Sequence, residues 1–76
     1  MNPEAIKSLI YADAFRPFRI HHKKGKVYDV PHHDWAWVSP IGVCVVVEHE
    51  NGHRSMEILN PDMIEKISTH EEAETG

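Results

Sequence analysis

The sequence predicts a small, mainly β domain with an N-terminal helix, in which a strongly bent five-stranded antiparallel sheet closes into a barrel. Three observations lead to this prediction. Apolar residues follow a helical spacing only near the start, alternate with polar residues from Phe18 to Ile67, and are interrupted by tight-turn sequences. The 76 residues suffice for one domain, which we place at residues 1–67, followed by a disordered acidic tail at residues 68–76.

The helix is predicted over residues 3–13. Asn2 can cap its first turn, and Pro3 suits the first helical position. Pro17 disfavours helical geometry at the residue before it, so the helix must end upstream. Its apolar stripe consists of Ile6, Leu9 and Ile10.

The remaining elements are short strands separated by turns. Gly25 and the Asn51-Gly52 pair supply the residues that tight hairpins need. The turn at residues 39–42 interrupts the third strand, which resumes as the strongly β-forming run at residues 43–47. The expected strand segments are residues 18–23, 26–30, 35–38, 43–47, 54–59 and 63–67.

The stretch FRPFRIHHKKGKVYDVPHHDW from Phe15 to Trp35, together with Ser39-Pro40, carries a family resemblance. It resembles a family of short bacterial proteins with an RPFRPF-like opening, a glycine-containing basic hairpin, and VPHP and SP motifs, a family without an assigned activity. The helix-plus-strands order also looks like the Sm-like and SH3-like small barrels. The Sm-like resemblance implies ring assembly and RNA binding, although the Sm-like glycine, aspartate–asparagine loop and later glycine motif are missing.

Composition restricts the setting of the protein. The net charge is −4, no apolar run approaches the roughly 20 residues of a membrane span, and the N-terminus lacks the features of a secretory signal. A single cysteine, Cys44, lies in an apolar run, which fits a buried thiol in a reducing compartment. We therefore expect a cytoplasmic protein without a membrane partner.

A basic segment forms the first candidate site. Residues 1–26 carry a charge of +4, whereas residues 27–76 carry −8. Such asymmetry suggests a charged partner, and a basic strand–turn–strand could contact RNA or DNA phosphates. An exposed hairpin that lysines keep from pairing with other chains is the alternative interpretation. The candidate nucleic-acid-binding residues are Arg16, Arg19, Lys23, Lys24 and Lys26.

Seven histidines form the second candidate site. Imidazole is a good ligand for zinc and nickel, and His49 and His53 flank a predicted hairpin turn where they could face each other. Solvated or capping histidines are the alternative, because no metal-binding motif is present. The candidate metal ligands are His32, His33, His49 and His53.

Self-association is the third expectation and the preferred function. A core this small, with open sheet edges, favours docking of identical copies. We expect a non-enzymatic scaffold or binding module without a cofactor, because Cys44 is inert in apolar surroundings and no catalytic motif occurs. The candidate interface residues are Trp35, Trp37, Val43, Val45 and Val47.

Overall fold

The computed structural model describes residues 1–69, which form one helix, six strands and two short 3-10 turns. The predicted mainly β domain with an N-terminal helix is confirmed. The elements are α1 Pro3–Ile10, β1 Phe18–His22, β2 Val27–Val30, η1 His33–Trp35, β3 Ala36–Ser39, β4 Gly42–Glu48, β5 Arg54–Leu59, η2 Pro61–Met63 and β6 Ile64–Thr69.

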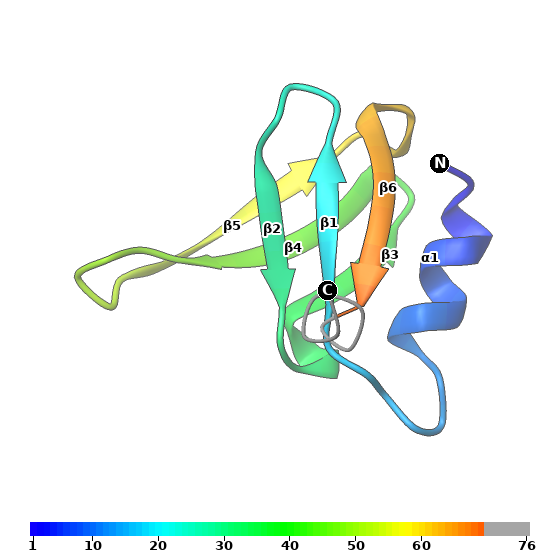
Figure 1. Cartoon of the computed structure of the whole chain (residues 1–76), viewed down its shortest axis with the longest axis horizontal. Helices are drawn as coiled ribbons and strands as arrows, with labels where there is room; N and C mark the ends of the chain where they lie inside the picture. The colour runs from blue at the N-terminus through cyan, green and yellow to red at the C-terminus, as the bar shows by residue number, and fades with distance from the viewer. Residues whose placement is uncertain (70–76) are drawn as a thin grey trace.

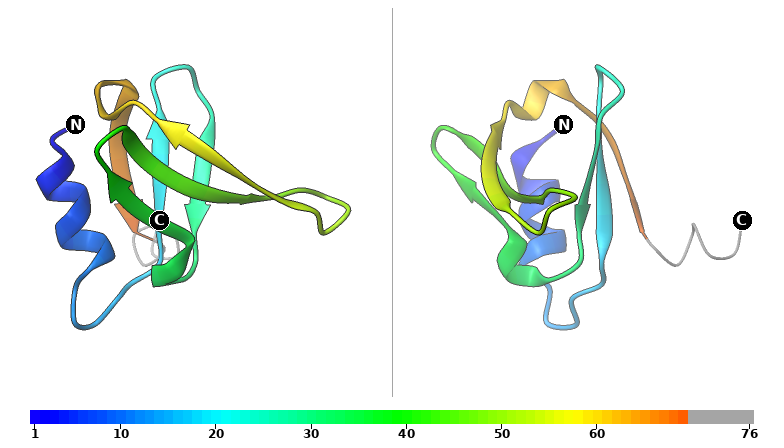
Figure 2. Two further views of the ribbon diagram at one scale, coloured as in Figure 1. Left: turned by 180° about the vertical axis from the view of Figure 1, so that it is seen from behind. Right: turned by 90° about the vertical axis from the view of Figure 1, so that its left-hand side faces the viewer.

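The strands form two antiparallel three-stranded sheets, with orders β2-β1-β6 and β3-β4-β5. The two sheets lie in separate layers, and the β4–β5 hairpin projects away from the body on the side opposite α1 (Figures 1 and 2). The prediction of one bent five-stranded sheet is therefore wrong. Neither sheet within residues 1–69 closes into a barrel.

Two turns explain the difference. Pro31 and the following η1 separate β2 from β3, so no continuous strand joins the two sheets. The segment at residues 39–42 reverses the chain instead of interrupting one strand. Ser39 pairs with Gly42, and β3 and β4 become neighbours in a hairpin. Gly42 adopts a φ of +145°, which a residue with a side chain rarely takes.

The helix and the final strand of the described residues end at other positions than predicted. The helix ends at Ile10, three residues earlier than predicted, and Tyr11 is its C-cap. The predicted N-cap is present: the backbone N–H of Glu4 donates to Asn2 Oδ1 at 2.9 Å. Strand β6 runs to Thr69, two residues into the expected tail, and residues 70–76 lie outside the described part.

The core lies between the two sheets and is closed on one side by α1. Ile6 and Ile10 of the helix are buried, as the apolar stripe predicted. The buried cluster comprises Ile6, Ile10, Phe18, Ile20, Tyr28, Val30, Ala36, Val43, Val45, Leu59 and Ile64. No helix within residues 1–69 has the length and apolar character to cross a membrane.

Candidate interaction surface

The outward side of sheet β3-β4-β5 is apolar, and we call it the outer face. Val43 and Val45 point into the core, so the alternation of a strand directs Cys44 and Val46 outward. Directly paired residues of antiparallel strands lie on the same side of the sheet. The cross-strand pairs then complete the outer face, which comprises Trp37, Cys44, Val46, Met56 and Ile58.

Much of this surface is open to solvent. Trp37 is 37% exposed, Met56 53% and Ile58 47%. Ile41, at 75% exposed, extends the surface at the β3–β4 turn, where it lines a shallow hollow together with Ile58. The thiol of Cys44 is free but only 4% exposed. The outer face therefore presents contiguous large apolar side chains to water.

The second sheet provides an internal comparison. The outward side of sheet β2-β1-β6 is mostly polar: Arg19 Nε lies 3.9 Å from Asp29 Oδ1, and His21 Nε2 lies 2.8 Å from Ser68 Oγ. This is the usual pattern of an antiparallel sheet with one solvated side. The outer face of sheet β3-β4-β5 departs from that pattern, and this departure makes it the candidate interaction surface.

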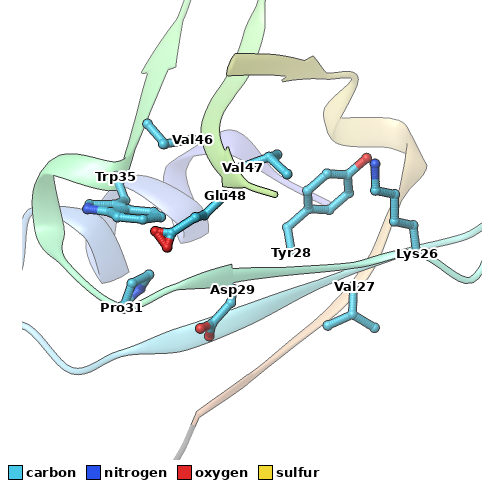
Figure 3. A pocket seen from close by; sticks show the side chains of 9 residues that line it. All are labelled: Lys26, Val27, Tyr28, Asp29, Pro31, Trp35, Val46, Val47 and Glu48. Atoms are coloured by element: carbon cyan, nitrogen blue, oxygen red, sulfur yellow. The ribbon is translucent and has the colours of Figure 1, made fainter. Parts of the chain in front are cut away.

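A charged rim borders the outer face towards the projecting hairpin. The guanidinium of Arg54 lies 4.9 Å from the Trp35 ring centre, and its Nε lies 3.4 Å from Glu48 Oε2. The same rim borders a hollow of about 300 Å³ between the two sheets. Figure 3 shows Glu48 and Pro31 beside the Trp35 ring at one end of this hollow, with Tyr28 and Lys26 at the other end.

A hydrogen-bonded triad links the two sheets at the Tyr28 end of that hollow. Lys26 Nζ donates to Glu57 Oε2 at 3.0 Å, and the Tyr28 hydroxyl donates to Glu57 Oε1 at 3.0 Å. The hydrogen bond from Lys26 lowers the pKa of Glu57, against the opposing effect of its partial burial. Burial, together with the bond to Glu57, raises the pKa of Tyr28. We call this triad the latch, because it joins β2 to β5.

The structure corrects part of the predicted interface. Val43 and Val45 are completely buried between the sheets, so neither offers surface to a second copy. Val47 is partly buried against the core. Trp37 does lie on the outer face, and Trp35 lies at its rim. Met56 and Ile58 are absent from the predicted interface, although both lie on the outer face. The usual strand directs its polar residues outward, whereas β5 directs Ser55 and Glu57 inward and its apolar residues Met56 and Ile58 outward.

The predicted basic segment does not present all of its charges in one place. Arg19 pairs with Asp29, and Lys26 pairs with Glu57 in the latch. Lys23 and Lys24 occupy the exposed β1–β2 turn, whereas Arg16 precedes the opposite end of β1. Strand β1 contributes about 3.3 Å per residue to the separation of these groups.

The candidate metal ligands separate into two pairs. His49 and His53 stack across the β4–β5 turn with ring centres 5.7 Å apart, as the hairpin position predicted. The rings of His32 and His33 instead contact two different aromatic side chains, those of Trp35 and Phe15. Among residues 1–69, no three His, Cys, Asp or Glu side chains form a group suited to a metal ion.

Comparison with known proteins adds no relative. No protein-family model matches the sequence, and no curated protein or solved structure is significantly similar to it. The resemblance to the bacterial RPFRPF family thus stays a prediction, and the function has to be argued from the outer face itself.

Proposed function

We propose that this protein is a non-enzymatic, self-associating β module whose outer face docks against the outer face of a second copy. The main support for this proposal is the difference in polarity between the outward sides of the two sheets. One sheet has a polar outward side with an ion pair and a hydrogen-bonded histidine, and the other presents Trp37, Met56 and Ile58. Burial of such apolar surface is the main favourable term in protein association.

The distribution of charge on and around the outer face favours a second copy of this chain as the binding partner. The five residues of the outer face carry no charge, and the rim adds one acid, Glu48, and one base, Arg54. A two-fold interface brings the same patch of each copy together. Because the rim carries one acid and one base, Glu48 of each copy can lie near Arg54 of the other. The rim itself has no net charge, so the net charge of −4 of each chain does not oppose the contact there.

The expected interface also has the right anatomy. Aromatic and methionine side chains are enriched in the centres of protein interfaces, where charged residues are depleted, and polar groups occupy the rim. Trp37 and Met56 match the centre, and the Glu48–Arg54 pair matches the rim. A chain of this size buries a modest share of its surface alone, so docking supplies additional burial.

The test is the oligomeric state of a substituted outer face. Complete burial of an isoleucine side chain contributes about 1.5–3 kcal/mol. Ile58 is 47% exposed in the single chain, so roughly half of this contribution remains to be gained when a second copy covers it. Because a two-fold interface contains the residue twice, Ile58→Ala should weaken association by about 2 kcal/mol, or roughly 30-fold in Kd. Ile58→Lys should give a monomer, because it also buries an ammonium group.

Val27→Lys is the matched control. Val27 is also 47% exposed, but it lies on the outward side of the other sheet, opposite His21. Light scattering after size exclusion should show an oligomer for the natural chain and for Val27→Lys, and a monomer for Ile58→Lys, with unchanged circular dichroism. A natural chain that stays monomeric into the millimolar range, or an Ile58→Lys oligomer, would contradict the proposal.

A further inference from the structure

The tip of the β4–β5 hairpin carries a second feature that self-association does not use. His49 and His53 stand at equivalent positions on the two sides of the turn, and their rings stack at 5.7 Å with an angle of 29° between planes. Both residues are exposed. With Glu50 and Asn51 they line an open hollow of about 460 Å³.

The backbone holds the two histidines in this arrangement. The N–H of His49 donates to the carbonyl of His53 at 2.7 Å, and the N–H of Gly52 donates to the carbonyl of His49 at 2.9 Å. The N–H of His53 also donates to Asn51 Oδ1 at 2.9 Å. Gly52 takes a φ of +83°, as the turn requires. The hairpin therefore holds the backbones of His49 and His53 side by side.

A hydroxyl group orients one of the rings. His49 Nε2 lies 2.8 Å from Ser55 Oγ on the adjacent strand. When Nε2 carries the proton and donates it to Ser55, the lone pair resides on Nδ1. A hydrogen bond of this kind fixes the tautomer of a metal-bound histidine and raises its basicity. Ser55 thus acts as a positioning residue for His49.

We propose that His49 and His53 form a two-histidine clamp for an imidazole-preferring divalent cation of the zinc, nickel and copper class. Neutral imidazole nitrogen is a preferred ligand of these cations. With two protein ligands, water would complete the coordination sphere. This cation site is independent of the outer face.

The other described histidines lack this geometry. His21 is bonded to Ser68, and His22 Nδ1 accepts a hydrogen bond from the Lys24 N–H at 3.1 Å. The neighbouring His32 and His33 contact separate aromatic rings. His32 and His33 provide the matched control, because they are also exposed histidines between two strands.

The test is calorimetric titration of the chelator-treated full chain with ZnCl2. The natural chain should bind one Zn²⁺ at this site, and His49→Ala and His53→Ala should each weaken that binding at least tenfold. Ser55→Ala should weaken it about tenfold, which is typical for loss of a group that orients a ligand. His32→Ala and His33→Ala should leave the affinity unchanged.

Cu²⁺ provides a spectroscopic readout of the same site. The electron paramagnetic resonance spectrum of the Cu²⁺-loaded chain should show hyperfine coupling to two imidazole nitrogens, and His53→Ala should reduce this to one. Equal Zn²⁺ affinity in the natural chain, His49→Ala and His53→Ala would overturn the proposal, as would an equal loss in His32→Ala. Ile58→Lys should bind Zn²⁺ normally, which separates this result from the oligomerisation test.

Discussion

Gly42→Ala should be the most damaging single methyl addition among the three glycines of residues 1–69 that have a positive φ. A Cβ built at Gly42 lies 2.6 Å from the Leu59 carbonyl oxygen and 2.9 Å from Ile58 Cγ2. The first distance is 0.8 Å short of the 3.4 Å at which ordinary contact begins. The obstacle is backbone of the adjacent strand, which cannot rotate away.

The expected cost has two parts. Holding alanine at positive φ costs roughly 1–2 kcal/mol, and forcing an extra group into a packed position costs about 1–3 kcal/mol. A loss of about 3 kcal/mol is large for a chain of this length, whose total stability should be about 4–11 kcal/mol. Gly25→Ala and Gly52→Ala are controls, since nothing lies within 4 Å of either added Cβ. Each should cost only the conformational part.

The measurement is urea unfolding followed by the fluorescence of Trp35 and Trp37. All variants should carry Met56→Lys, which places a charge on the outer face and keeps Ile58, so that association does not contribute to the measured free energy of unfolding. If Gly42→Ala loses no more stability than Gly25→Ala, the close approach of β4 and β5 at this turn is not as described.

Two further predictions concern the latch and the helix. The pKa of Glu57 is below its usual value of 4.5, because its ionised carboxylate is bonded to Lys26 in the folded state. The contribution of Glu57 to the free energy of unfolding is therefore complete above pH 4.5 and is lost as the carboxylate becomes protonated at lower pH. The urea midpoint should fall as the pH falls below that value, and Glu57→Gln should reduce this dependence; an equally steep acid profile in Glu57→Gln would exclude Glu57 as its source. Asn2→Ala removes the acceptor of the Glu4 N–H and should cost about 1 kcal/mol in the same assay, whereas Ser8→Ala, on the exposed side of α1, should cost less. Equal losses in the two variants would argue against the cap.

The sequence was informative where local physics decides the outcome. The cap at Asn2, the hairpin at Asn51-Gly52 and the alternation along β1 and β2 follow from residue type and spacing, and the structure confirms them. The stacked pair of His49 and His53 follows from the same hairpin. Each of these features involves residues only a few positions apart in the chain.

The sequence was misleading where the outcome depends on which strands pair and in which register. The apolar run at residues 43–47 indicated burial on both sides, but it does not specify what covers each side. Nothing in the local pattern distinguished a core contact for Val45 from an outward position for Val46. Met56 and Ile58 were likewise read only as strand residues. Their outward direction depends on the register between β4 and β5.

The pairing of β1 with β6, the last strand within residues 1–69, has a consequence for synthesis. His21 and Ser68 meet although they are 47 positions apart, and β1 lies between β2 and β6. A nascent chain can form the β1–β2 hairpin early, but β6, the second neighbour of β1, does not exist until residue 69 has been synthesised. Synthesis of β6, rather than emergence of the first half of the domain, should therefore set the moment at which this domain acquires its cooperative fold.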